Sequence, residues 1–134
     1  MFEGFGTGVI HYHATQFPDE YRNVFFVNDW MRREVYAFKP QWDGALLKCE
    51  GGFPGIFAHA EGGRTLPGSS GRVFDPTDIE VGPDGALYIL SWGHAYGATI
   101  NDGKQVDAGR VYRIRYAKRP LAEWKSDRRG KPAR

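Results

Sequence analysis

The sequence predicts an all-β protein, and three observations support this. Glycine is abundant, at 18 of 134 residues, and aromatic residues make up 15% of the chain. Apolar residues alternate with polar ones over short stretches, and long helical patterns are missing. Short strands joined by tight turns explain such a pattern, whereas a helical protein would show longer periodic segments.

The clearest unit covers residues 74–92 and resumes at 109–116. A tight turn at Pro83-Asp84-Gly85 separates its first two strands, and a long loop leads to the third. Three consecutive short strands of this kind outline one blade of a β-propeller. The strands are marked by Ile79 and Val81, by Leu87 and Ile89, and by Tyr112, Ile114 and Tyr116.

The first half of the chain predicts a second blade. One helical turn is expected at 17–22, where Pro18 can begin it. The first blade then covers about 9–50, a glycine-rich connector covers 51–73, and the other blade covers 74–116. Residues 117–134 follow as a basic tail. The strands of the first blade are expected at 9–13, 24–27, 34–38 and 45–49, the last returning as its fourth strand.

A weak internal repeat relates the two blades. In both, an apolar strand ends at a tryptophan, Trp30 or Trp92, and a loop leads to a strand that begins Val-Tyr. A closed propeller usually has about four to eight blades, so two blades cannot close by themselves. We therefore expect about two blades of a six-bladed propeller, either a part of a larger one or a subunit completed by oligomerisation.

Composition excludes several classes of protein. No apolar run approaches the roughly 18 residues of a membrane-spanning helix, and the N-terminus lacks the basic start and apolar run of a signal peptide. Cys49 is the single cysteine, which excludes an intrachain disulfide. Basic residues gather after Tyr116, and a solvated terminus is the simpler interpretation of that tail. We expect no nucleic-acid partner.

Three stretches resemble the C-terminal blades of the glucose/sorbosone dehydrogenase family, six-bladed propellers that use pyrroloquinoline quinone (PQQ). They are Phe17-Pro-Asp-Glu-Tyr-Arg22, Phe25-Phe-Val-Asn-Asp-Trp30, and Pro76-Thr-Asp-Ile-Glu-Val-Gly-Pro-Asp-Gly-Ala-Leu-Tyr88 with Gly109-Arg-Val-Tyr-Arg-Ile114. The resemblance implies a quinone cofactor held over the central channel by Ca2+ and basic side chains. A histidine of the family accepts the substrate's proton while hydride passes to the quinone.

That histidine and most Ca2+ ligands belong to earlier blades of the family. The resemblance therefore implies part of an enzyme that oxidises a carbohydrate hydroxyl or aldehyde, inactive as an isolated piece and periplasmic or secreted. In the glucose-oxidising members, Arg-x-Arg-Asp leads the inner strand of the last blade, whereas this chain has Asp75-Pro-Thr-Asp78. A basic residue after strand 24–27 also matters in those members, and Arg32 or Arg33 can serve for it.

Four residues are the candidate cofactor-binding residues. Asp78, at the start of the innermost strand, can bind a cation or a sugar hydroxyl, or can hydrogen-bond the backbone of the adjacent blade. Trp92 can stack on a sugar or quinone, or can cap the blade core as Trp30 would. His94 can donate to an oxygen or ligate a metal. The full set is Arg32, Asp78, Trp92 and His94, with no catalytic residue and no metal ligand expected.

Two histidines lie on one predicted strand face at His11 and His13. No third ligand is close in sequence, so we interpret them as surface or packing residues. Two other functions also remain open for the whole chain. One is a propeller without catalysis that binds carbohydrate or protein through its rim aromatics. The other is a structural subunit, of which three copies would supply six blades.

Overall fold

The computed structural model describes residues 6–48, 55–59, 74–92 and 109–123. The predicted all-β class is confirmed, because antiparallel strands form small sheets of four, two and three strands. No helix in this described part is long and apolar enough to cross a membrane. In chain order, the elements are β1 (Gly6–Tyr12), η1 (Asp19–Tyr21), β2 (Val24–Asp29), β3 (Glu34–Phe38), β4 (Gln41–Asp43), β5 (Leu46–Lys48), β6 (Gly55–His59), β7 (Pro76–Val81), β8 (Leu87–Ser91) and β9 (Arg110–Ile114).

Two of the sheets have the up-and-down order expected of propeller blades. The first sheet has the order β1-β2-β3-β6, and the second has the order β7-β8-β9. Every neighbouring pair is antiparallel. The helical turn expected at 17–22 is present as η1, directly after Pro18. The tight turn after β7 is also present, because the backbone N–H of Gly85 donates to the carbonyl of Gly82 at 2.9 Å.

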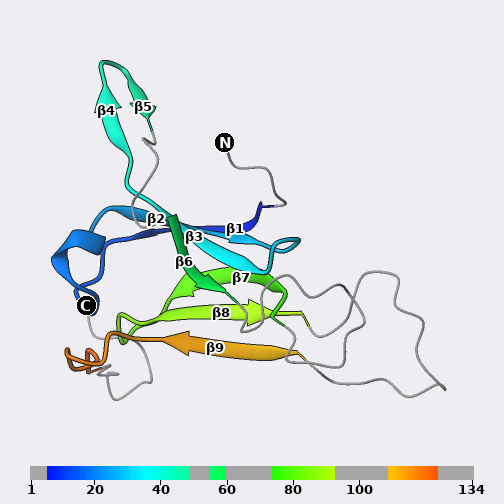
Figure 1. The fold of residues 1–134 in the computed structure, drawn as a ribbon. Coiled ribbons are helices and arrows are strands. Elements are labelled where there is room, and N and C mark those ends of the chain that lie inside the picture. The colour runs from blue at the N-terminus through cyan, green and yellow to red at the C-terminus, as the bar shows by residue number, and fades with distance from the viewer. Residues whose placement is uncertain (1–5, 49–54, 60–73, 93–108, 124–134) are drawn as a thin grey trace, which may run out of the picture.

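The prediction for the fourth strand of the first blade was wrong. Residues 46–48 form β5, which pairs only with β4 in a separate hairpin that projects away from the two sheets (Figure 1). The fourth strand is instead β6, which lies within the connector expected over 51–73 and pairs with β3. Gly44 forms the turn of the hairpin with a φ of 62°. The chain therefore reverses directly after β4, and β5 pairs with β4 and not with the edge of β3.

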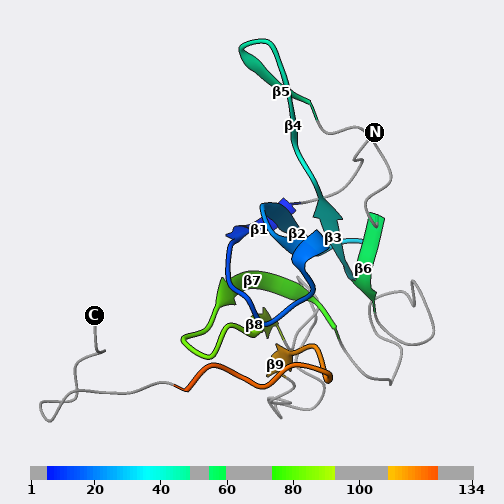
Figure 2. The same ribbon diagram turned by 90° about the vertical axis from the view of Figure 1, so that its left-hand side faces the viewer.

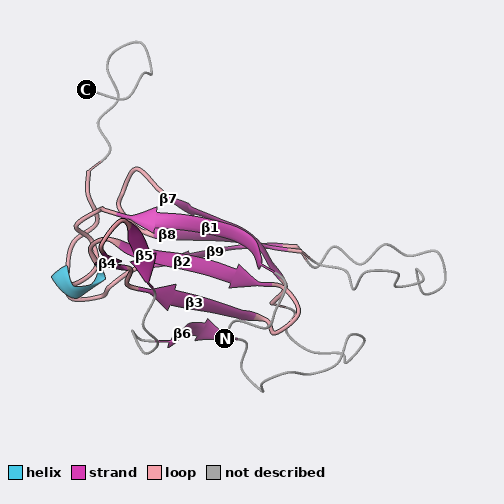
Figure 3. Ribbon diagram, turned by 90° about the horizontal axis from the view of Figure 1, so that it is seen from above, coloured by secondary structure: helices cyan, strands magenta, loops and turns pink. Residues whose placement is uncertain are grey.

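The two sheets pack face to face, and the hydrophobic core lies between them (Figures 2 and 3). Alternation along each strand places one set of apolar side chains inward. Phe26 of β2 is fully buried within an aromatic cluster, with the Phe57 ring 4.6 Å from its own. The other buried core residues are Tyr12, Phe17, Val24, Val35, Ala37, Ile79, Leu87 and Ile89.

Strands β1 and β7 run side by side in the same direction. Near their starts, the Thr7 hydroxyl donates to the carbonyl of Pro76 at 2.7 Å. At the end of β1, the Tyr12 hydroxyl donates to the carbonyl of Gly85, in the turn after β7, at 2.8 Å. Gly8 permits this approach, because a Cβ there would lie 3.0 Å from the Cα of Asp78. The starts of β1 and β7 and the ends of β2 and β8 therefore gather at one end of the molecule.

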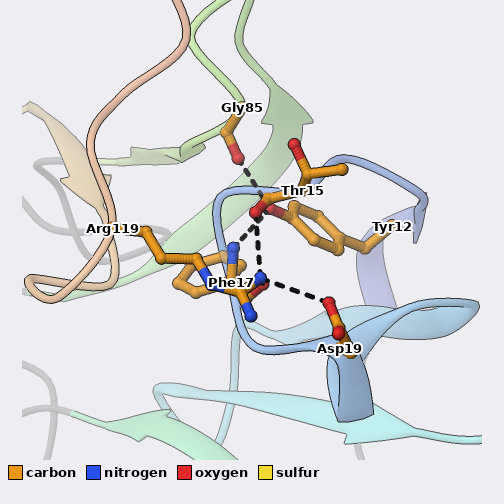
Figure 4. A network of polar contacts seen from close by, with 6 residues as sticks. All are labelled: Tyr12, Thr15, Phe17, Asp19, Gly85 and Arg119. Carbon is orange, nitrogen blue, oxygen red and sulfur yellow. Dashed lines mark hydrogen bonds and ion pairs between the residues drawn. The ribbon is translucent and has the colours of Figure 1, made fainter.

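The opposite end is closed by the network in Figure 4. Arg119, which follows β9, donates to the carbonyl oxygens of Thr15 at 3.1 Å and Phe17 at 2.6 Å, and its Nη1 lies 3.3 Å from Asp19 Oδ1. The Tyr12 hydroxyl, which donates to Gly85, also accepts the backbone N–H of Phe17 at 3.1 Å. These contacts tie the segment after β9 and the turn after β7 to the first sheet.

Replacing Gly85 by Ala is expected to destabilise the fold by about 2 kcal/mol, because the added side chain is strained at positive φ and is also crowded by Gln16. Gly85 has a φ of 80°, and an added Cβ would lie 3.0 Å from the Cβ of Gln16. Gly44→Ala is the matched control, since its φ is 62° but nothing lies within 4 Å of the added Cβ. Urea unfolding measures both variants. An equal loss in the two variants would contradict the close packing at Gly85.

Candidate functional site

The predicted site residues that the structure describes lie at or near the end where β1 and β7 start. We define the strand-end rim as the loop from Asp29 to Glu34, the chain at Asp75, and the end of β8 at Ser91 and Trp92. The loop is held by Asp29, whose Oδ1 accepts the backbone N–H of Arg32 at 2.9 Å. The next residue of the loop, Arg33, takes a positive φ of 58°, which turns the chain into β3.

An ion pair joins the two sheets at this rim. The Nε of Arg33 lies 2.9 Å from Oδ1 of Asp75, and the two side chains are only 11% and 4% exposed. Asp75 is fixed further by its backbone, because its N–H donates to the Ser91 hydroxyl at 2.9 Å and its carbonyl accepts the N–H of Trp92 at 2.8 Å. The pair is therefore a rigid part of the interface between the blades.

The electrostatics of this pair favour a structural role. Burial raises the pKa of the Asp75 carboxyl, and the Arg33 guanidinium offsets that rise only in part. For the pKa of Asp75, removal of the carboxylate from water therefore outweighs the attraction of the guanidinium. The charge of Arg33 is directed at Asp75, so it is poorly placed to hold an anionic ligand.

The two tryptophans at equivalent positions of the internal repeat meet at the rim. The ring centroids of Trp30 and Trp92 lie 6.3 Å apart, with an interplanar angle of 38°. Trp92 remains 40% exposed. The exposed indole of Trp92, in contact with that of Trp30, offers an apolar surface on which a sugar or another flat ring can stack.

Arg32 is the more accessible of the two rim arginines, with a side chain that is 27% exposed. Its Nε lies 3.8 Å from Oδ2 of Asp29, and its Nη1 donates to the Tyr36 hydroxyl at 3.5 Å. The Tyr36 hydroxyl in turn donates to Glu34. Burial and this bond to Glu34 raise the pKa of Tyr36, so the phenol stays protonated near neutral pH. Because its side chain is partly exposed and a guanidinium has several N–H donors, Arg32 can donate to a ligand oxygen at the rim.

Asp78 lies further along β7 than the rim. Its side chain is exposed, and its Oδ1 accepts the backbone N–H of Ile79 at 2.9 Å. The hydrogen bond to the backbone agrees with the structural alternative for this residue, although the amide belongs to its own strand and not to the adjacent blade. His94 lies outside the described residues. Of the four candidates, Arg32 and Trp92 therefore belong to the rim, Arg32 in its loop and Trp92 directly after β8.

Sequence reasoning missed one buried polar residue beside the rim. Asn28 of β2 is fully buried, and its side-chain atoms have no hydrogen-bond partner within the described part of the chain. Its amide is near Gly8 of β1, where an added Cβ would lie 3.2 Å from Nδ2. The sequence indicated it only by the pair Asn28-Asp29 at the end of an otherwise apolar strand, because a polar side chain buried there needs a hydrogen-bond partner.

The paired histidines are His11 in β1 and His13 directly after it. The rings of His11 and His13 lie 6.0 Å apart, and His11 stacks on Phe25 at 4.7 Å. Among the described residues, no group of three or more His, Cys, Asp or Glu is placed to hold a metal ion. The stacking on Phe25 supports the interpretation of His11 as a packing residue.

A groove of about 760 Å³ lies at the opposite end of the molecule from the rim. It runs between the end of β1, the turn after β7 and the segment at 119–122. Its polar side chains already bind the protein itself: Gln16 donates to the carbonyls of Tyr116 at 2.8 Å and Arg119 at 3.1 Å. We therefore regard this groove as the seam that anchors the segment after β9, and the rim as the candidate site.

Comparison with known proteins adds no functional assignment. No family model, no curated protein and no solved structure matches this chain.

Proposed function

We propose that the strand-end rim binds a carbohydrate, and that the chain forms two blades of a propeller resembling the glucose/sorbosone dehydrogenases. The observation that carries the proposal is the pair of indoles at 6.3 Å with Trp92 partly exposed. The C–H face of a pyranose is apolar, whereas its edge carries hydroxyls. A stacking indole and a hydrogen-bonding guanidinium on the same rim match these two features.

The polar part of this site is supplied by Arg32. Its guanidinium carries several donors in one plane, and its side chain is 27% exposed on the same loop that carries Trp30. Arg33 contributes indirectly, because its ion pair with Asp75 fixes the loop that carries Arg32 against the start of β7. The chain thus supplies groups that orient a sugar, and the proposal assigns it no bond-breaking step.

The described residues do not form a complete binding site for PQQ and Ca2+. PQQ is an anionic quinone, and its binding requires several unpaired positive charges or a metal. Arg33 is paired with Asp75, and Arg32 lies beside the buried carboxylate of Asp29. Where the glucose-oxidising members of the family that the sequence resembles carry the two arginines of Arg-x-Arg-Asp, this chain has Asp75 and Thr77, and only the final aspartate is kept, as Asp78. The geometry therefore favours the binding alternative over direct cofactor binding by these blades.

Trp92→Ala is expected to weaken sugar binding by about two- to tenfold, the usual contribution of one aromatic contact. Isothermal titration with D-glucose and with L-sorbose, as an aldose and a ketose probe, measures the affinity. Trp42→Ala is the matched control, because Trp42 is 76% exposed on the β4–β5 hairpin and should not affect binding. Absence of binding by the wild-type chain, or equal losses in both variants, would contradict the proposal.

A separate titration distinguishes the two functional classes. PQQ is added to the chain in the presence of Ca2+, and the quinone absorbance is followed. The binding function predicts no change. A saturable absorbance change that Arg32→Ala abolishes would instead show that the rim holds the cofactor, and would replace the sugar assignment.

A further inference from the structure

The contact between the two sheets uses one face of each sheet. The inner face of the first sheet carries Tyr12, Val24 and Phe26, and the inner face of the second carries Ile79, Leu87 and Ile89; all six side chains are almost fully buried. The outer faces point away from this core. Large apolar residues are exposed on both of them, with Val9 at 61% on the first sheet and Leu90 and Val111 at 46% and 65% on the second.

The internal repeat shows how the outer faces relate to the inner ones. When Trp30 is aligned with Trp92, Phe26 corresponds to Tyr88, and Phe25 corresponds to Leu87. Phe26 lies on the inner face of the first sheet, whereas Tyr88 lies on the outer face of the second. Conversely, Leu87 lies on the inner face of the second sheet, and Phe25 lies on the outer face of the first.

The other aligned positions of these two strands also lie on opposite faces, inner in one sheet and outer in the other. Asn28 of the inner face corresponds to Leu90 of an outer face, and Ile89 of the inner face corresponds to Val27 of an outer face. The outer face of the second sheet is therefore equivalent to the inner face of the first. Likewise, the outer face of the first sheet is equivalent to the inner face of the second. One contact geometry can thus be used twice, once within the chain and once between chains.

The two outer faces carry polar groups that can pair, because an imidazole can donate a hydrogen bond to a carboxylate. The outer face of β1 carries His11, which stacks on Phe25, next to the exposed Val9. The outer face of β7 carries two exposed carboxylates, Asp78 and Glu80. Within the chain β1 lies beside β7, so a repeat of that contact places β1 of a second copy beside β7 of the first. It brings His11 of one copy toward the carboxylates of the other.

We propose that the chain associates head to tail with copies of itself, the outer face of the first sheet of one copy packing on the outer face of the second sheet of the next. The contact is heterologous, because the two faces differ, and rotation by a fixed angle at each step closes a ring. Since closed propellers have about four to eight blades, and the described residues of each copy supply two, a ring contains about two to four copies.

The wild-type chain, of mass 15.1 kDa, is expected to show one closed oligomer by light scattering, dissociating to monomer on dilution. Two variants each block one face. Val9→Glu places a carboxylate opposite Asp78 and Glu80, and Leu90→Lys places an ammonium in an apolar contact. Both positions are exposed, so the melting temperature of the monomer should not change. Each variant alone should be a monomer at a concentration where the wild type is assembled.

Mixing the two variants provides the decisive result. Each retains one intact face, and the two intact faces are complementary, so the mixture should form a one-to-one dimer that grows no further. Leu46→Lys is the control, because Leu46 is 70% exposed on the β4–β5 hairpin and should leave assembly unchanged. A wild-type chain that is monomeric at every concentration, or a mixture that stays monomeric, would overturn the proposal.

Discussion

Replacing Arg33 by Met is expected to destabilise the fold by about 3–5 kcal/mol, the usual cost of removing one partner of a buried ion pair. The variant leaves the Asp75 carboxylate, only 4% exposed, without the guanidinium that lies 2.9 Å from it. Urea unfolding followed by circular dichroism measures the loss. A folded domain is stable by only about 5–15 kcal/mol, so this loss is a large fraction of the total.

The double variant Arg33→Met with Asp75→Leu is the matched control for this prediction. It replaces both charges by apolar groups, and such a replacement is often nearly neutral. The double variant should therefore recover at least half of the stability that Arg33→Met loses. A double variant as unstable as the single one would show that Arg33 acts through contacts other than its ion pair.

The cost of Arg33→Met should also depend on pH. Burial already raises the pKa of Asp75 above its unfolded value, and loss of Arg33 raises that pKa further. A carboxyl with a raised folded pKa binds protons more readily in the folded state. Its contribution to stability is therefore complete below the unfolded pKa and is lost as pH rises through the folded pKa. The difference between wild type and variant should shrink as the pH is lowered from 7 toward 4.

Replacing Phe26 by Ala is the second substitution with a large expected effect, a loss of about 3–5 kcal/mol. Phe26 is fully buried, and the rings of Phe57, Tyr12 and Tyr21 lie 4.6, 5.9 and 6.3 Å from its own. Its removal leaves a cavity between strands β2 and β6 and the η1 turn, which the backbone cannot close. Thermal unfolding of the dilute monomer measures the effect.

Trp42→Ala supplies the control for Phe26, because a larger aromatic residue is removed from an exposed hairpin. A substitution at an exposed site usually changes stability by less than about 0.5 kcal/mol. Comparable losses for the two variants would mean that the core does not lie between the two sheets. An effect restricted to Phe26 would place the main hydrophobic stabilisation in the aromatic cluster.

Local signals in the sequence were sufficient for most strands of the two sheets. The strand expected at 34–38 matches β3 in full, and the strand expected at 24–27 lies within β2. Apolar alternation and β-branched residues mark these strands, and Pro83-Asp84-Gly85 marks the turn between β7 and β8. These features depend on neighbours in the chain, so sequence reasoning can find them.

Features that depend on distant residues were not predicted. The fourth strand of the first blade was assigned to 45–49 because Leu46 and Leu47 give a stronger strand signal than the glycine-bounded β6. Pairing with β3 determines which segment becomes the fourth strand, and local sequence patterns do not reveal that pairing. The ion pair between Arg33 and Asp75 is similar, because the contact exists only after the two sheets have packed.

Binding of a sugar at the strand-end rim can be observed directly through the indole N–H resonances of the chain. The chain has four tryptophans, so a ¹⁵N-labelled sample gives four indole signals that single substitutions can assign. On titration with D-glucose, we expect the signals of Trp30 and Trp92 to shift in a saturable way while that of Trp42 stays fixed. If the signals of Trp30 and Trp92 do not move, or if Trp42 responds in their place, the rim is not a sugar site.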